Sequence, residues 1–270
     1  MRVASIQANV VFNDPGANAR FAVAELERLA TQGVELAVLP ECFLTGYCVD
    51  SLEQAGSIAI RCDDLALRAV RDAAERTGIT TVLGFAEADG GKLYNSVALF
   101  EPGKEPRYYR KTHLPELGYD KFATTGDALE NFDTAKARIG VIICFDQRFP
   151  EPARVLALDG ADVILLPTNW PEGAENSAEI MCIARAAENR VWFVTANRVG
   201  TENGFRFIGR SKIISPTGKV LAAAGTEAET LVADIDLAEA RLKRTVNVPG
   251  KYEMEVFKPR RPELYKKLVE

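Results

Sequence analysis

The chain has 270 residues, of which 47% are hydrophobic, and a formal charge of −5. An apolar fraction of this size can form one sizeable core, so we expect a single domain over residues 1–270. Acidic and basic residues are interleaved, which excludes the extended positive surface that nucleic-acid binding requires. With no apolar run long enough to span a bilayer and no secretory leader pattern, we expect a cytoplasmic protein without membrane or nucleic-acid partners.

Hydrophobic periodicity along the chain predicts an α/β fold with a mixed sheet. Buried strands are expected at residues 3–8, 34–39, 79–85, 96–100, 139–144, 163–166, 191–196, 211–214 and 230–235. Helices with apolar positions three and four residues apart are expected at 17–31, 63–77, 152–158 and 175–190. The charged and proline-interrupted residues 241–270 are expected to form a C-terminal arm, either on the surface or packed on a partner subunit.

The histidine and cysteine content limits the chemistry. His113 is the single histidine, whereas zinc hydrolases, metalloproteases and facial-triad oxygenases need two or three imidazole ligands. The five cysteines are odd in number and have no CxxC spacing, which disfavours a disulfide framework and a structural zinc site. A serine–histidine triad has no GxSxG motif to supply its serine. We therefore expect no metal site and at least one thiol that is free to react.

Three expected strand ends carry groups that can do chemistry. They are Glu41 in LPECFLTGY, Lys111 in RKTHLPE, and Cys144 in VIICFDQRFPE, where the cysteine is expected to close its strand. A thiol attacks as the thiolate, which an ammonium stabilises and a carboxylate of raised pKa can generate by accepting the proton. Each residue also has an ordinary interpretation: Cys144 as an apolar filler, Glu41 as a cap and Lys111 as a solvated edge residue.

The three segments, in this order, resemble the signature segments of the nitrilase, or carbon-nitrogen hydrolase, superfamily. YNS at residues 94–96, the segment ending in PTNWP at Pro171, and the segment ending in TANRVG at Gly200 add to the resemblance. It implies an α-β-β-α sandwich that pairs into a four-layer α-β-β-α-α-β-β-α dimer or a larger homo-oligomer. It also implies a Glu–Lys–Cys triad that acts on a small amide without a metal or an organic cofactor.

The resemblance assigns roles to the triad. Cys144 forms a thioester, Glu41 is first the general base and then the general acid, and Lys111 stabilises the oxyanion together with the backbone N–H of Phe145. His113 is then expected to be a hydrogen-bonded structural residue, and Cys42 a packing residue.

A second carboxylate is expected near the lysine, because members of the superfamily often carry another glutamate in the following loop. Here that loop reads PELGYDKFATTGD and is slightly shorter. Asp120 is the best match and Glu116 is its competitor. Alternatively, Asp120 only pairs with Lys121 on the surface.

The residues after the cysteine indicate the substrate class. Cys-Phe-Asp at residues 144–146 resembles the amidase and carbamoylase branches, whereas branches that hydrolyse nitriles commonly have Trp-Glu there. We expect an aliphatic amide, an omega-amide or an N-carbamoyl compound, with a nitrilase or a catalytically silent scaffold as alternatives. Tyr47, Asn169 and Trp170 are expected to line the pocket. Arg148 is expected either to bind a substrate carboxylate, as implied by the omega-amidase-like branch, or to form an ion pair with Glu151.

Overall fold

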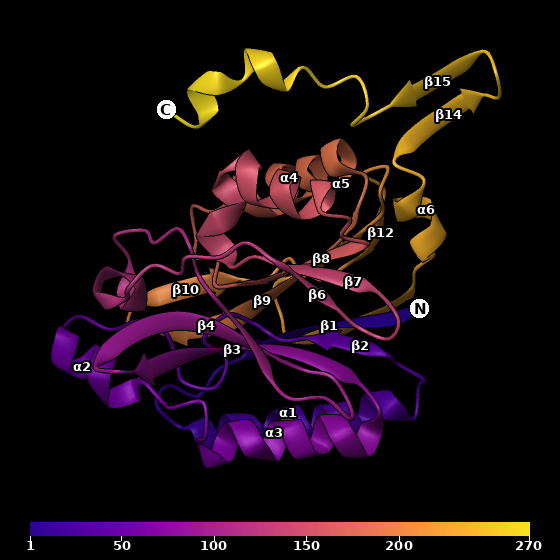
Figure 1. Cartoon of the computed structure of the whole chain (residues 1–270). Helices are drawn as coiled ribbons and strands as arrows, with labels where there is room; N and C mark the ends of the chain where they lie inside the picture. Colours follow the sequence, from indigo (N-terminus) through magenta and orange to yellow (C-terminus); the bar gives the residue numbers. More distant parts are fainter.

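Two β-sheets lie face to face between two pairs of helices in the computed structural model, which describes residues 1–270. Helices α1 (Pro15–Ala30) and α3 (Leu65–Thr77) cover one outer face, and α4 (Pro150–Leu158) and α5 (Cys182–Asn189) cover the other (Figure 1). The α/β class is confirmed, and the layers are those of the expected α-β-β-α sandwich. None of the helices combines the length and the apolar character that crossing a bilayer requires.

The first sheet has the strand order β5-β4-β3-β2-β1-β13. Its strands are β1 (Arg2–Asn9), β2 (Leu36–Val38), β3 (Thr80–Asp89), β4 (Lys92–Phe100), β5 (Arg107–Arg110) and β13 (Glu229–Asp234). The pairs β1–β2 and β2–β3 are parallel and the others are antiparallel, so the sheet is mixed, as predicted.

The second sheet has the order β6-β7-β8-β9-β11-β12, and β10 extends β9 as a hairpin. Its strands are β6 (Asn131–Asp133), β7 (Arg138–Val141), β8 (Val163–Thr168), β9 (Trp192–Glu202), β10 (Phe205–Ile208), β11 (Lys212–Ile214) and β12 (Val220–Ala223). The two sheets are joined where the end of β1 pairs with β9, at Ala8 opposite Arg198.

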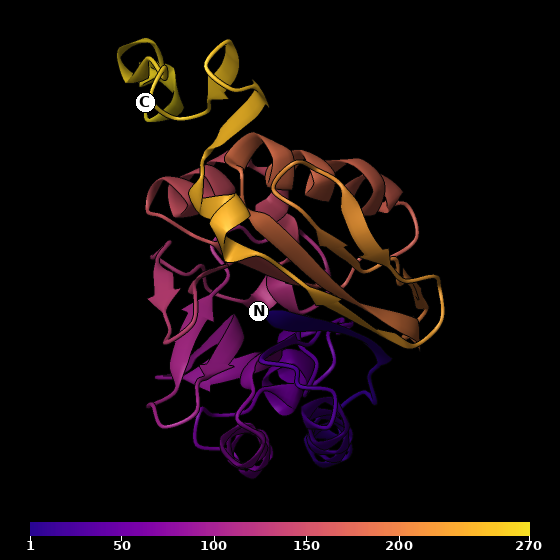
Figure 2. The same ribbon diagram turned by 90° about the vertical axis from the view of Figure 1, so that its right-hand side faces the viewer.

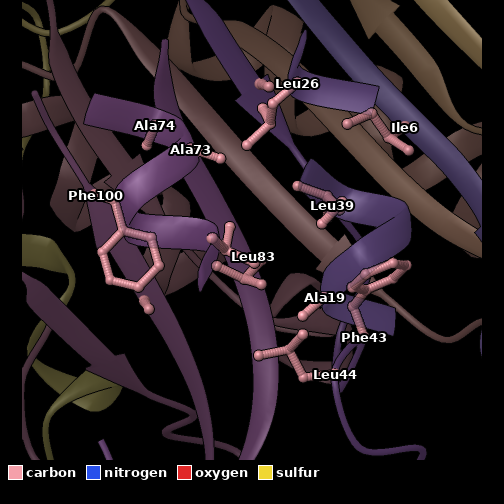
Figure 3. Close-up of a cluster of buried hydrophobic side chains, with 14 of the residues drawn as sticks. Ile6, Ala19, Leu26, Leu39, Phe43, Leu44, Ala73, Ala74, Leu83 and Phe100 are labelled. Atoms are coloured by element: carbon pink, nitrogen blue, oxygen red, sulfur yellow. The ribbon is translucent and has the colours of Figure 1, made fainter. Parts of the chain in front are cut away.

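Three apolar layers hold the sandwich together. One lies between the first sheet and α1 and α3, where Leu26, Leu83 and Phe100 meet (Figure 3). The second joins the inner faces of the two sheets and includes Val38 and Val194. The third lies between the second sheet and α4 and α5. Because each sheet buries both faces, its central strands are continuous apolar runs.

Two helical segments differ from the sequence expectation. Residues 175–190 form a π-helical turn, η3 (Ser177–Met181), before α5 begins. Gln147 donates to the backbone oxygen of Ser177 and Lys212 to that of Ala178, so side chains from outside the segment bind carbonyls of the wider turn. A short helix, α2 (Leu52–Ile58), was not predicted because it has too few residues to show a period.

Residues 241–270 form an arm beyond α4 and α5 (Figures 1 and 2). After α6 (Leu237–Arg241), strands β14 (Arg244–Val248) and β15 (Tyr252–Glu255) pair only with each other. The base of the arm is fixed, because Arg241 forms two hydrogen bonds to Asp162, at 2.8 and 2.9 Å, and Lys243 donates to two backbone oxygens.

Candidate active site

The turn after β2 places Glu41 at the edge of the first sheet. The chain leaves the strand at Leu39 and folds back over β3, where the backbone N–H of Leu44 donates to the oxygen of Gly84. Residues 40–42 lie so close to β3 that a Cβ atom on Gly84 would be 2.4 Å from the nitrogen of Cys42 and 2.7 Å from the Cα of Glu41. A glycine at this strand position therefore sets the location of Glu41.

Lys111 follows β5 directly, and its backbone N–H donates to the oxygen of Asn95 on β4. Its ammonium lies 2.7 Å from Oε1 of Glu41 and 2.6 Å from Oδ2 of Asp120, and all three side chains are fully buried. The structure therefore joins two of the three predicted strand-end residues in one ion-pair cluster.

Asp120 is the second carboxylate of this cluster. It lies in the short helix η1 (Gly118–Phe122) and accepts hydrogen bonds from Lys111, from Nδ2 of Asn95 at 2.8 Å and from the Tyr47 hydroxyl at 2.9 Å. The alternative surface ion pair with Lys121 is not formed, because η1 turns the aspartate inward. Glu116 is exposed and takes no part in the cluster.

The expectation that Cys144 closes a buried strand is wrong. Strand β7 ends at Val141, and Cys144 begins the helical turn η2 (Cys144–Arg148) with a positive φ of 41°. The cause is Asp146, whose carboxylate accepts the backbone N–H of Ile143 at 2.9 Å and so ends the strand pairing. Non-glycine residues with positive φ are uncommon, and such strained turns concentrate at functional sites.

Asp146 also ties the cysteine turn to the segment that carries Lys111. Its fully buried carboxylate accepts hydrogen bonds from the Tyr109 hydroxyl at 2.7 Å, from Thr112, and from the backbone N–H of His113 at 2.9 Å. The ring nitrogen Nδ1 of His113 lies 2.8 Å from the same carboxylate. The histidine is thus hydrogen-bonded as expected.

Cys144 lines a pocket of about 310 Å³ with the expected residues Tyr47, Asn169 and Trp170. Tyr47 connects this pocket to the buried ion-pair cluster, since its hydroxyl donates to Asp120. The remaining lining residues are Pro115, Leu117, Phe145, Arg148, Pro171, Glu172, Gly173, Ala174 and Ser177. Two larger cavities near Cys62, of about 380 and 500 Å³, lie away from the ion-pair cluster.

Arg148 faces this pocket and forms no ion pair with Glu151. Glu151 instead lines a separate cavity between α4 and the C-terminal arm, together with Arg154 and Arg260. The two side chains therefore point to different surfaces, and the expected alternative of a structural ion pair is wrong. The guanidinium of Arg148 is exposed at the pocket.

Burial dominates the electrostatics of the site. It raises the pKa of Glu41 above the usual value of 4.5, in part against the nearby charge of Lys111. Burial lowers the pKa of Lys111, but the charges of Asp120 and Glu41 outweigh this and raise it overall. Burial and the charge of Glu41 raise the pKa of Cys144 to about 12, while Lys111 and the Thr168 hydroxyl act in the opposite direction. This upward shift favours the protonated thiol over the thiolate at neutral pH.

Two unused groups show what the cluster can do. Oε2 of Glu41 is buried and has no hydrogen-bond partner, so a lone pair is available to accept a proton. The ammonium of Lys111 has three N–H donors, and Glu41 and Asp120 occupy two of them. One donor remains for an oxygen that gains negative charge.

Sequence reasoning missed two residues that shape the site. Asn95 was noted only within the YNS segment and Asp146 only within Cys-Phe-Asp, although both are completely buried. An asparagine within an apolar strand is a usable signal, because asparagine is depleted in strands. The partners of these residues come from other segments and could not be read from the sequence.

Comparisons with known proteins agree with this geometry. A family model described as carbon-nitrogen hydrolase matches residues 2–245. A protein named nitrilase from Pyrococcus abyssi is 41% identical, over 98% of this chain and 99% of that protein. An omega-amidase from Homo sapiens is 31% identical, over 92% and 91% of the two chains.

Among solved structures, an amidase mutant from Nesterenkonia sp. AN1 is similar along the whole of both chains, with a TM-score of 0.81 and 25% identity. That structure shows acrylamide added to the active-site cysteine of the amidase. The resemblance inferred from the three sequence segments is confirmed, and the chain belongs to the carbon-nitrogen hydrolase family.

Proposed function

We propose that this protein is a cysteine-dependent amidohydrolase, which cleaves a small carboxamide to the acid and ammonia through a thioester on Cys144. The observation that carries the proposal is the position of a thiol on a strained turn, in a pocket that Tyr47 connects to a buried Glu41–Lys111–Asp120 cluster. Relatives and structural neighbours that are named amidases support it.

The chemistry follows from the two unused hydrogen-bonding groups of the cluster, Oε2 of Glu41 and the third N–H of Lys111. Oε2 of Glu41 accepts the thiol proton as the sulfur of Cys144 attacks the amide carbon. The oxyanion that forms is stabilised by the third N–H of Lys111 and by the backbone N–H of Phe145. Glu41 then returns the proton to the leaving nitrogen, and ammonia departs. Its raised pKa suits a group that both accepts and donates a proton.

Deacylation reverses the same proton movements. Glu41 removes a proton from a water molecule, the hydroxide attacks the thioester carbon, and the oxyanion again binds Lys111. Collapse of this intermediate breaks the carbon–sulfur bond, and the proton returns to the sulfur of Cys144. Asp120 keeps the ammonium in place through its 2.6 Å contact.

The test is ammonia release from short carboxamides together with mass spectrometry of the acylated protein. The Cys144→Ala variant should show neither ammonia release nor the acyl adduct. Cys62→Ala, at a cysteine that is also partly exposed, should show both. Ammonia release at the normal rate by Cys144→Ala would refute the mechanism. A catalytically silent scaffold would release no ammonia from any amide and would show no acyl adduct.

We propose a small substrate with a terminal anion. Tyr47 and Trp170 line the pocket, and we propose that the unpaired guanidinium of Arg148 binds a carboxylate at the far end of an omega-amide. An Arg148→Gln variant should raise KM for an omega-amide by about tenfold or more while leaving KM for an uncharged aliphatic amide nearly unchanged. An equal change for both substrates would exclude this role.

A nitrilase remains the second candidate, because the relative from Pyrococcus abyssi carries that name. The same thiol would then attack a nitrile carbon and give a thioimidate. Kinetics with a nitrile and the amide of the same carbon skeleton decide between the two. A higher kcat/KM for the nitrile would favour the nitrilase.

We also propose that the arm of residues 241–270 packs on a second copy of the chain, in the four-layer dimer that the family resemblance implies. The hairpin exposes Val246, Val248, Tyr252 and Met254, and the fixed base of the arm holds this apolar surface away from the sandwich. A chain shortened to residues 1–243 should therefore run as a monomer in light scattering, and the full chain as a dimer or larger. A full chain that is monomeric at micromolar concentration would exclude the proposal.

A further inference from the structure

The two oxygens of the Glu41 carboxylate have different surroundings. Oε1 accepts hydrogen bonds from Lys111 and from Nδ2 of Asn95, both at 2.7 Å. Oε2 has no partner, although it is equally buried. A carboxylate held by two donors on one oxygen cannot exchange its oxygens without breaking both bonds.

Asn95 is itself oriented from three sides. Its two N–H donors bind Oε1 of Glu41 and Oδ1 of Asp120, at 2.7 and 2.8 Å, and the thiol of Cys42 lies 3.5 Å from its Oδ1 as a donor. The reversed amide would place its oxygen against two carboxylates, which is repulsive. Its backbone oxygen also accepts the N–H of Lys111, so one residue adjoins each member of the ion-pair cluster.

We infer that Asn95 is a positioning residue that holds Oε1 of Glu41, so that Oε2 alone exchanges protons with the thiol and the leaving nitrogen. This inference rests on the proposed function. Without Asn95, only Lys111 holds Oε1, so the carboxylate rotates about its terminal bond more easily and the proton can reside on either oxygen.

Removing the Asn95 amide should also change the pKa of Glu41. The Asn95 donor favours the ionised form of Glu41 and acts against the effect of burial on its pKa. An Asn95→Leu variant, which keeps the volume but not the donors, should therefore raise the pKa of Glu41 further. The acidic limb, which is the fall of kcat/KM on the low-pH side of its profile, should move to higher pH by about one unit or more. In addition, kcat at its optimum should fall by about tenfold or more, with KM nearly unchanged.

A matched control lies next to it on the same strand. Ser96 is also completely buried, but its hydroxyl donates to Glu87, outside the ion-pair cluster. Ser96→Ala should leave the acidic limb where it is in the native protein. Cys42→Ala removes only the group that orients the Asn95 oxygen, so it should shift the limb in the same direction as Asn95→Leu but less.

The experiment compares the pH profiles of these variants and follows protonation of Glu41 by infrared difference spectroscopy, with Glu41→Gln identifying the carboxyl band. An upward shift in both measurements for Asn95→Leu and Cys42→Ala, but not for Ser96→Ala, is the expected result. An unshifted carboxyl band in Asn95→Leu and Cys42→Ala overturns the inference, whether or not the protein turns over amides. Absence of ammonia release by the native protein, with the band shifted, overturns only the proposed function.

Discussion

Replacing Gly84 by alanine should move Glu41 without touching any catalytic side chain. The new Cβ would lie 2.4 Å from the nitrogen of Cys42, 2.7 Å from the Cα of Glu41 and 2.7 Å from the oxygen of Pro40. All three are backbone atoms, so no side-chain rotation relieves the contact. To reach an ordinary contact distance of 3.4 Å, the Glu41 turn must retreat by about 1 Å, and a displacement of that size costs roughly 100-fold in rate.

The overpacked strand should also lower the free energy of unfolding by about 1–3 kcal/mol. Ammonia release measures kcat, and thermal melting measures stability. Gly56→Ala is the matched control, because nothing lies within 4 Å of its added Cβ and its φ is not positive. It should leave kcat unchanged and stabilise the protein by about 0.4–1 kcal/mol. A native kcat in a folded Gly84→Ala variant would refute the claim that this glycine locates Glu41.

Three further predictions follow from the buried charges. Lys111→Met leaves two buried carboxylates without their cation and should lower the free energy of unfolding by about 3–5 kcal/mol in chemical denaturation. Lys136→Met, which breaks a half-exposed ion pair, should lower it by less than about 1 kcal/mol. Equal losses would contradict the greater contribution of the buried ion pairs. Because burial raises the pKa of Glu41 above 4.5, kcat/KM should fall as the pH decreases, with a midpoint above pH 4.5. The contribution of this carboxyl to stability should decrease as the pH rises through its folded pKa. A midpoint at or below pH 4.5 would contradict the prediction. Asp146→Asn loosens the turn that holds Cys144, so it should lower kcat more than it raises KM and should slow alkylation of Cys144 by iodoacetamide. An unchanged rate of alkylation would contradict this role of Asp146.

The sequence predicted the layers of the fold better than its irregular parts. Strand β8 was expected at 163–166 and spans Val163–Thr168, and α3 was expected at 63–77 and spans Leu65–Thr77. Both have long apolar patterns whose period is fixed by burial. The π-helical turn and the β14–β15 hairpin were not foreseen. Side chains from distant segments support the first, and the second consists of short exposed strands that mix charged and apolar residues.

The sequence was sufficient to select candidate site residues but not to place them. Glu41, Lys111 and Cys144 could be selected because their residue types and order match a family pattern. Whether Asp120 lies inside depended on the turn at Gly118, whose φ of 50° no local pattern specifies. The position of Cys144 outside its strand depended on one hydrogen bond from Ile143 to Asp146, which competes with strand pairing by a margin too small to read from sequence.

The ion-pair cluster and the cysteine proposed as the nucleophile belong to opposite halves of the sandwich. Glu41 and Lys111 extend from β2 and β5 of the first sheet, whereas Cys144 follows β7 of the second. The alignment of Glu41 and Lys111 with Cys144 therefore depends on how the two sheets pack against each other. On gentle heating, enzymatic rate should decline before circular dichroism reports any melting, since a slight slip between the halves separates acid from nucleophile while every strand stays intact.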